Sequence, residues 1–323
     1  MQPLVTIGMP SYNRADYIKR SVNSILDQTY TNFELIIYDD GSSDNTLEIL
    51  DTLSDERINY FSFSNKGVPE PLNYIYKEAK GEFIIILHDN DLFDETLIER
   101  CVNSLKMYKD VGFILPGASN IDPDGETNLV ELLEDLPLEN KGNQFLREIL
   151  ENKKSFTCRF HGCSMIRRSA LEKVGFYYSK KYSWYADIDL WMRLLKEHDF
   201  IYLKENLIKF TRREAEHEIN SQPIKTLNLL HEIHSDNLNR NFNNQQELSL
   251  YRHYLSQRYF NEVFRIFVSQ IALGNNEITS QIEEIKKDAL NKFHFLVFNI
   301  LRLKLVSILL VLYKNLKNYL KYT

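Results

Sequence analysis

The stretch LVTIGMPSYNRADYIKRSVNSILDQTYTNFELIIYDDGSSDNT, residues 4–46, decides the fold. It has the pattern of a buried strand, a turn with Pro10 and Asn13, an amphipathic helix, a second buried strand over Glu34–Tyr38, and an acidic turn that begins at Asp39. This order predicts an open α/β sheet, in which ligands bind at the carboxyl ends of the strands. The acidic turn therefore predicts the rim of a ligand pocket.

The first turn lacks a glycine-rich phosphate loop. Met9-Pro10-Ser11-Tyr12 follows the first strand and contains neither G-x-G-x-x-G nor G-K-[ST]. A carboxylate at the second strand end suits the polar edge of a base or ribose. If the fold binds a nucleotide, another group must hold the diphosphate.

A second acidic cluster offers that group. Phe83–Leu87 is a short apolar run that predicts a buried strand, and His88-Asp89-Asn90-Asp91 follows it. Mg²⁺ or Mn²⁺ is usually held by one or two carboxylates together with substrate phosphates. A solvated loop with an Asx turn is the alternative for any single cluster. Two clusters at successive strand ends favour a site.

These motifs together resemble the family 2 glycosyltransferases of GT-A fold. The similarity covers about residues 4–221 and rests on several segments in order: Pro10-Ser11-Tyr12-Asn13-Arg14, Asp39-Asp40-Gly41-Ser42, Asn65-Lys66-Gly67 with Asn73, Ala79-Lys80-Gly81-Glu82, Arg167–Phe176 and Ala186–Arg193. The resemblance implies an α/β catalytic domain over residues 1–221, with a mostly parallel Rossmann-like sheet flanked by helices.

The resemblance assigns a nucleotide-sugar site to the strand ends. Tyr12 would stack on the base, Asp40 would accept a hydrogen bond from the base, and Asp89 would lie near the ribose. Pro10, Arg14 and Lys66 belong to the same donor-binding segments. The nucleotide expected first is UDP.

The family's metal motif is altered here. Its usual run is D-x-D-D, and in that register His88 and Asn90 stand where the first two carboxylates belong, while Asp91 keeps the last position. Shifting the frame by one gives Asp89-x-Asp91, so which side chain touches the cation stays open. The resemblance implies Mn²⁺ or Mg²⁺ held by Asp91, Asn90 and His217.

Asp187 matches the family's catalytic base. Inverting transfer needs one carboxylate to take the proton from the acceptor hydroxyl. The family's preceding glutamate is Ala186 here. An N-terminal helix residue is the alternative for Asp187 and is the interpretation that we favour for Asp189.

His217 resembles a late histidine of the family that meets the metal or the diphosphate. The alternative is an exposed histidine in a charged stretch. Arg212 or Arg213 could clamp a phosphate, or pair with Glu214, Glu216 or Glu218.

Composition agrees with an enzyme of the cytoplasm. The 323 residues carry a formal net charge of −6, which gives no reason to expect nucleic-acid binding. Three cysteines make an odd number without a disulfide framework, and we expect no signal peptide. Cys158, His161 and Cys163 form too small a set to favour a zinc site over a buried strand.

The pattern changes after about Asn220. Glycine is almost gone and apolar residues recur at helical spacing, which predicts an α-helical extension over residues 222–323. Residues 289–323 contain six Lys or Arg and no Asp or Glu. Because Asn299, Arg302 and Lys304 interrupt the apolar run, a helix lying on an anionic membrane surface is favoured over a spanning one. A helix that pairs with another subunit, in a homo-oligomer, is the alternative.

The function expected from these residues is sugar transfer. The donor would be a nucleotide-diphosphate sugar, and the acceptor a hydroxyl of a glycan or lipid-linked molecule at the cytoplasmic face of the bacterial inner membrane. Two alternatives remain: a sugar nucleotidyltransferase, which would want a glycine- and lysine-rich phosphate loop, and an inactive sugar-nucleotide-binding or scaffold relative. The sequence leaves the donor sugar, the acceptor and the linkage open.

Overall fold

A computed structural model gives the fold of most of the chain. It describes residues 2–67, 69–122, 127–131, 136–151, 162–176, 181–182, 185–211, 223–242 and 244–272. The chain divides into two compact units, one made of Met1–Ile149 with Lys154–Glu214 and the other of Leu150–Lys153 with Ala215–Thr323.

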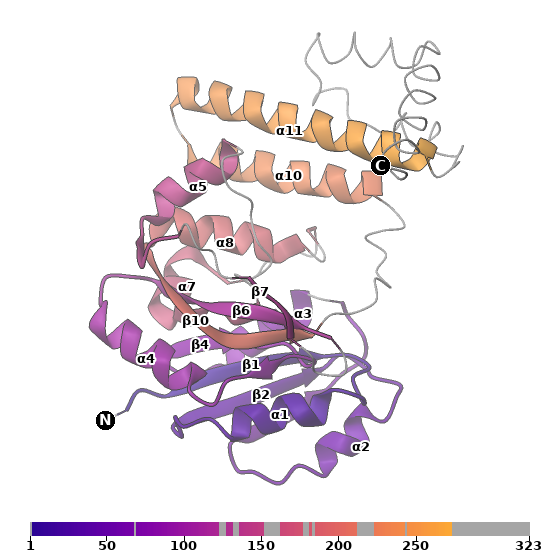
Figure 1. Cartoon of the computed structure of the whole chain (residues 1–323), viewed down its shortest axis with the longest axis vertical. Helices are drawn as coiled ribbons and strands as arrows, with labels where there is room; N and C mark the ends of the chain where they lie inside the picture. The colour runs from indigo at the N-terminus through magenta and orange to yellow at the C-terminus, as the bar shows by residue number, and fades with distance from the viewer. Residues whose placement is uncertain are drawn as a thin grey trace, which may run out of the picture. The chain divides into compact units, whose positions relative to one another are not determined.

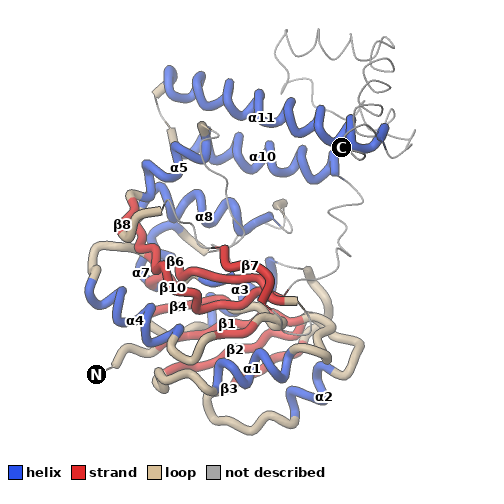
Figure 2. Tube along the Cα trace, in the orientation of Figure 1, coloured by secondary structure: helices blue, strands red, loops and turns tan. Residues whose placement is uncertain are grey.

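Ten strands of the described residues form one sheet in the first unit (Figure 2). Its order is β3 (Ile58–Ser62), β2 (Phe33–Asp39), β1 (Val5–Ser11), β4 (Phe83–Ile86), β9 (Met165–Arg167), β6 (Phe113–Ile121), β10 (Phe200–Thr211) and β5 (Leu92–Phe93). In addition, β7 (Thr127–Glu131) pairs with β6, and β8 (Glu139–Asn140) pairs with β10.

Most of the long strands run in the same direction. β1 is parallel to β2 and β4, β2 is parallel to β3, and β6 is parallel to β10. β9 is antiparallel to both β4 and β6, so β6 and β10 run in the direction of β4. The carboxyl ends of β1, β2, β3, β4 and β10 therefore share one edge of the sheet. The expected α/β architecture is confirmed, with the reversed strands in its second half.

Helices cover both faces of the first half of the sheet. α1 (Ile18–Leu26) and α2 (Thr46–Asp51) connect strands that proceed outward from β1, whereas α3 (Pro69–Glu78) leads back to β4. Right-handed crossovers then place α3 on the opposite face from α1, as Figure 1 shows. α3 packs closely, because a Cβ on Gly8 of β1 would lie 2.3 Å from Cγ2 of Ile75.

The second half of the first unit is built around aromatic side chains. Its described helices are α4 (Leu97–Met107), α5 (Gly142–Leu150, of which all but Leu150 belongs to this unit), α7 (Arg168–Val174) and α8 (Ala186–Glu197). The ring of Phe113 stacks on Phe200 with centroids 5.0 Å apart and meets Trp191 of α8 edge-on at 5.3 Å. These contacts fix the start of β10 and the body of α8 on the sheet.

The second unit contains a pair of helices, α10 (Pro223–Asn241) and α11 (Gln245–Ala272). Leu238 of α10 and Tyr251 and Tyr259 of α11 are buried. Burial lowers the pKa of His234 to about 4, so this imidazole is neutral inside the unit at physiological pH. Within the described residues, none of the helices is both long and apolar enough to cross a membrane. The tail over residues 289–323 lies outside the described part of the chain.

Candidate active site

The loops that follow β1 and β2 are clasped together by side chain to backbone hydrogen bonds. The backbone amide of Asn13 donates to Ser42 Oγ at 2.8 Å, and the amide of Ser43 donates to Asn13 Oδ1 at 2.8 Å. Asn13 has a φ of +52°, a conformation that asparagine tolerates better than most residues. The backbone amide of Arg14 donates to Thr46 Oγ1 at 2.7 Å. The clasp makes the two strand ends one rigid rim.

Asp39, at the end of β2, organises its own turn. Its Oδ2 accepts hydrogen bonds from the backbone amides of Gly41 and Ser42 and from Ser62 Oγ, at 3.2, 3.1 and 3.0 Å. The side chain is fully buried. Gly41 has a φ of +79°, which its missing side chain permits. The first carboxylate of the acidic turn therefore has a structural role, which its place in the sequence pattern alone does not indicate.

Asp40 holds the loop that follows β3. Its Oδ1 accepts from the amide of Lys66 at 2.8 Å, and its Oδ2 accepts from the amide of Gly67 at 3.0 Å. Each carboxylate oxygen has two acceptor positions, and the partners within the described part of the chain leave one on each oxygen for a ligand. Tyr12, in the clasped loop, has 44% of its surface exposed and offers a ring face for stacking. Pro10, level with Tyr38 in the strand register, precedes this loop.

Lys66 stands over an aromatic cluster. Its Nζ lies 5.9 Å from the centroid of the Phe63 ring, and Phe63 stacks on Tyr38 at 4.8 Å. Tyr74 of α3 meets both rings edge-on. The cluster supports the loop that Asp40 binds. It also gives the Lys66 side chain an aromatic surface to pack on, although the loop itself is largely exposed.

Arg14 joins the first rim to the second acidic cluster. Its Nε donates to Asp89 Oδ1 at 3.2 Å, and its Nη1 donates to the backbone oxygen of Asn13 at 2.7 Å. Asp89 is buried, whereas the Arg14 side chain is about a quarter exposed. A guanidinium in this place is available to an anionic ligand that approaches the sheet edge.

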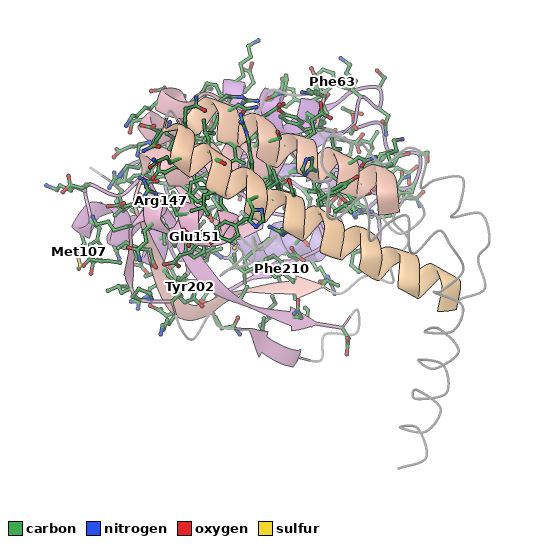
Figure 3. All side chains as sticks on the ribbon, turned by 90° about the horizontal axis from the view of Figure 1, so that it is seen from above. Phe63, Met107, Arg147, Glu151, Tyr202 and Phe210 are labelled. Atoms are coloured by element: carbon green, nitrogen blue, oxygen red, sulfur yellow. The ribbon has the colours of Figure 1, made fainter. Side chains whose placement is uncertain are left out.

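The turn over His88–Asp91 is held by hydrogen bonds to Thr211 of β10. Asp91 is buried, and its Oδ1 accepts from the backbone amide of Thr211 at 2.8 Å. Nδ1 of His88 lies 3.1 Å from Asp91 Oδ2. Nδ2 of Asn90 donates to Asp91 Oδ1 and to the carbonyl of Thr211, at 3.3 and 3.4 Å. Figure 3 labels Phe210, whose ring centroid is 6.4 Å from that of His88, and shows it well apart from Phe63.

The donor atoms of this turn suit a hard divalent cation. Among the described residues, Asp91 Oδ2 has His88 as its partner and keeps an acceptor position, and the side-chain amide of Asn90 carries an oxygen beside the donating Nδ2. One carboxylate and one amide oxygen are enough where phosphates complete the shell of Mg²⁺ or Mn²⁺. Among the described residues, no group of three or more His, Cys, Asp or Glu surrounds a common point. His217, Arg212 and Arg213 lie outside the described residues.

Asp187 stands at the start of α8. Burial raises the pKa of its carboxyl to about 6. A hydrogen bond from the backbone amide of Ile188 and the charge of His88 lower this pKa, but their effect is smaller. The charge of Asp187 in turn helps burial to raise the pKa of Tyr76. Asp189 differs, because its Oδ2 accepts from Nε of Arg193 at 3.0 Å. Asp189 is therefore committed to an ion pair within the helix.

Replacing Asn90 by aspartate should make the stability of the protein depend on a divalent cation. An oxygen in place of Nδ2 would face two acceptors and set a second carboxylate beside buried Asp91. Without a cation, the free energy of unfolding should fall by about 1–3 kcal/mol. Denaturant unfolding with EDTA and with excess Mn²⁺ measures this.

The matched control for that substitution is Asn32→Asp. Asn32 Nδ2 also donates to a carbonyl, that of Gln2, but at an exposed position. An Asn90→Asp protein that loses the same stability with EDTA and with Mn²⁺ would show that no cation binds at this turn.

The fold and these strand-end groups define an α/β protein with a polar site at one sheet edge, of the kind that binds nucleotides. The family model "Glycosyl transferase family 2" matches residues 6–175. The chain therefore belongs to glycosyltransferase family 2.

The relatives similar to this chain include a glycosyltransferase and a chondroitin synthase. An uncharacterized glycosyltransferase of Rickettsia typhi is 33% identical over 218 residues, which are 66% of this chain and 65% of that protein. Chondroitin synthase of Pasteurella multocida is 36% identical over 125 residues, 38% of this chain and 13% of the synthase. The chain thus spans less than two thirds of these relatives.

A solved structure shows the fold. S. aureus TarS, residues 1–349 in complex with UDP-GlcNAc, superposes with a TM-score of 0.62 at 18% identity, over 83% of this chain and 75% of that one. This likeness confirms the GT-A fold.

Proposed function

We propose that the chain transfers a sugar from a nucleoside-diphosphate donor to an acceptor hydroxyl with inversion at the anomeric carbon. The observation that carries this proposal is Asp187, a carboxylate whose pKa burial raises to about 6, electrostatically coupled to His88 of the strand-end turn. A general base with a pKa near the working pH is largely ionised and still basic enough to accept a proton. Membership of the family supports the reaction class.

In this proposal the nucleotide lies on the rim of β1, β2 and β4. Tyr12 stacks on the base, Asp40 accepts from it through its remaining acceptor positions, and Asp89 faces the ribose. Arg14 and Lys66 provide positive charge for the diphosphate, and Pro10 shapes the first loop. UDP is the preferred nucleotide, because the similar TarS structures contain UDP-GlcNAc and UDP.

The chemical step moves one proton and exchanges one bond. Asp187 takes the hydroxyl proton as the acceptor oxygen bonds to the anomeric carbon, while the bond from that carbon to the β-phosphate oxygen breaks. The diphosphate leaves with the electron pair of the broken bond. Asn90 and Asp91, with His217, would hold Mn²⁺ or Mg²⁺, which when bound neutralises charge on the leaving diphosphate.

The acceptor is proposed to be a glycan or a lipid-linked glycan. The relatives named chondroitin and hyaluronan synthases are consistent with a polysaccharide product. Residues 1–221 would form the catalytic domain and residues 222–323 the helical extension. The basic tail, residues 289–323, would bind an anionic membrane at the cytoplasmic face, or pair subunits in a homo-oligomer.

A second candidate function is nucleotide-sugar binding without catalysis. It is favoured by two residues of the altered motif, His88 and Asn90, which replace carboxylates, and by Ala186. Geometry weighs against it, because Asp91 and Asp187 are both present and held in defined surroundings.

Release of nucleoside diphosphate from a panel of UDP-, GDP-, dTDP- and CDP-sugars tests the proposal. With Mn²⁺ present, one UDP-sugar should be hydrolysed or transferred faster than the others, and EDTA should suppress the reaction. Binding of a donor with no release under either condition would establish the inactive relative instead. Release of pyrophosphate from a nucleoside triphosphate and a sugar phosphate would establish a nucleotidyltransferase.

A further inference from the structure

Thr211, the last residue of β10, is bonded to the His88–Asp91 turn through three of its own atoms. Its amide donates to Asp91 Oδ1 at 2.8 Å, its hydroxyl donates to the carbonyl of Asn90 at 2.6 Å, and its carbonyl accepts from Asn90 Nδ2 at 3.4 Å. Thr211 is only 6% exposed. One buried side chain and its backbone thus fix both residues proposed to meet the cation.

Arg20 of α1 closes the same network from the other side. Its Nη2 donates to the carbonyl of Asn90 at 3.1 Å and to Thr211 Oγ1 at 2.8 Å. Its guanidinium carbon lies 4.9 Å from the centroid of the Tyr17 ring. Because the threonine hydroxyl donates to Asn90, its lone pair is left to accept from Arg20. Every hydrogen bond in this triangle therefore has a defined direction.

The network joins three elements that are far apart in the sequence. Arg20 is 70 residues from Asn90 and 191 residues from Thr211. α1 follows the loop that carries Tyr12 and Arg14. Arg20 therefore links this loop, proposed to bind the nucleoside, to the His88–Asp91 turn, proposed to bind the diphosphate. A change in any one of these elements would displace the carbonyl of Asn90. The side chains of Asn90 and Asp91 would move with it.

We propose that Arg20 and Thr211 are positioning residues that set Asn90 and Asp91 for the cation and the donor diphosphate. This inference rests on the proposed function. Neither side chain is assigned to touch the substrate; each acts through Asn90 and Asp91. Groups that orient metal ligands in this way typically change metal affinity or activity by about 10- to 100-fold when removed.

The decisive variants are Thr211→Val, which keeps the shape and removes the hydroxyl, and Thr211→Ser, which keeps the hydroxyl. Arg20→Lys is the second line of test, because an ammonium keeps the charge but loses the planar fork. Thr52→Val is the matched control. The Thr52 hydroxyl also donates to a backbone carbonyl, that of Ile49, but at an exposed helix end.

The readout is the gain in UDP affinity that Mn²⁺ produces, measured by calorimetry with EDTA and with Mn²⁺ on the full chain. In Thr211→Val that gain should shrink about tenfold, with UDP affinity in EDTA unchanged. Thr211→Ser should recover it to within about threefold, and Arg20→Lys should fall between the two. Thermal unfolding of each variant separates loss of fold from loss of positioning.

An unchanged gain in Thr211→Val and Arg20→Lys, whatever their thermal stability, would overturn the positioning role while leaving the proposed function intact. A drop in affinity equal in EDTA and in Mn²⁺ would also overturn it, since it would show a merely structural role. If the unaltered protein bound no nucleotide, the proposed function itself would fail, and the positioning role with it.

Discussion

Replacing Asp187 by asparagine should lower the turnover number for sugar transfer by about 10²- to 10⁴-fold, the usual contribution of a positioned base. The amide keeps the shape of the carboxylate but cannot accept the hydroxyl proton. The donor KM should change little, because the side chains proposed to bind the nucleotide lie on other elements. Steady-state kinetics with the preferred donor measure both quantities.

The same substitution should stabilise the protein at pH 8. The folded-state pKa of Asp187, about 6, lies above the ordinary value for aspartate, so the folded state binds the extra proton between about pH 4 and 6. The free energy of unfolding of the unaltered protein therefore falls as the pH rises from about 4 to about 6. Asparagine removes the cost of this partly buried charge, a gain of about 1–3 kcal/mol at pH 8 that should diminish at pH 5.

Asp189→Asn is the control and should behave in the opposite way. Asp189 pairs with Arg193, whose Nη1 donates to the carbonyls of Val174 and Gly175. Removing the charge should cost about 3 kcal/mol of stability and leave turnover close to normal. Near-normal turnover in Asp187→Asn, or an equal loss of donor affinity, would remove Asp187 from the role of base.

Replacing Asp40 by alanine should raise the Kd for UDP by about 10- to 100-fold. A hydrogen bond to a charged acceptor contributes about 1.5–3 kcal/mol, which corresponds to this range of affinities. Alanine would also leave the amides of Lys66 and Gly67 without their acceptors, so the free energy of unfolding should fall. Calorimetry and denaturant unfolding give the two numbers separately.

Gly67→Ala shows how much of that effect comes from the loop alone. Gly67 has a φ of +83°, so alanine strains the loop while the Asp40 carboxylate remains. Its Kd for UDP should rise much less than that of Asp40→Ala. If a folded Asp40→Ala protein bound UDP with unchanged affinity, the uracil ring would have to bind elsewhere.

The first half of the fold was predictable from the sequence for a physical reason. The strands over residues 5–11, 33–39 and 83–86 are almost entirely buried on both faces, so each is made mostly of apolar residues. Each run ends at a polar turn, and parallel pairing brings those turns to one edge. The candidate residues Tyr12, Asp40 and Asp91 lie in these turns, within reach of pattern analysis.

The supports of the site could not be predicted in the same way. Arg20 is a polar residue on an amphipathic helix, and Thr211 ends a strand, so neither differs locally from a surface residue. Their partners are fixed only by tertiary pairing across the sheet. Asp39 is the intermediate case, because an aspartate that bonds to the amides of its own turn is a local pattern.

A crystal structure of the protein with UDP and Mn²⁺ tests the central claim most directly. We expect the uracil ring against Tyr12 with a hydrogen bond to Asp40, and the diphosphate beside Asn90 and Asp91 at the shared carboxyl edge of β1, β2, β4 and β10. A nucleotide bound away from this edge, with these side chains still in the contacts described here, would contradict it.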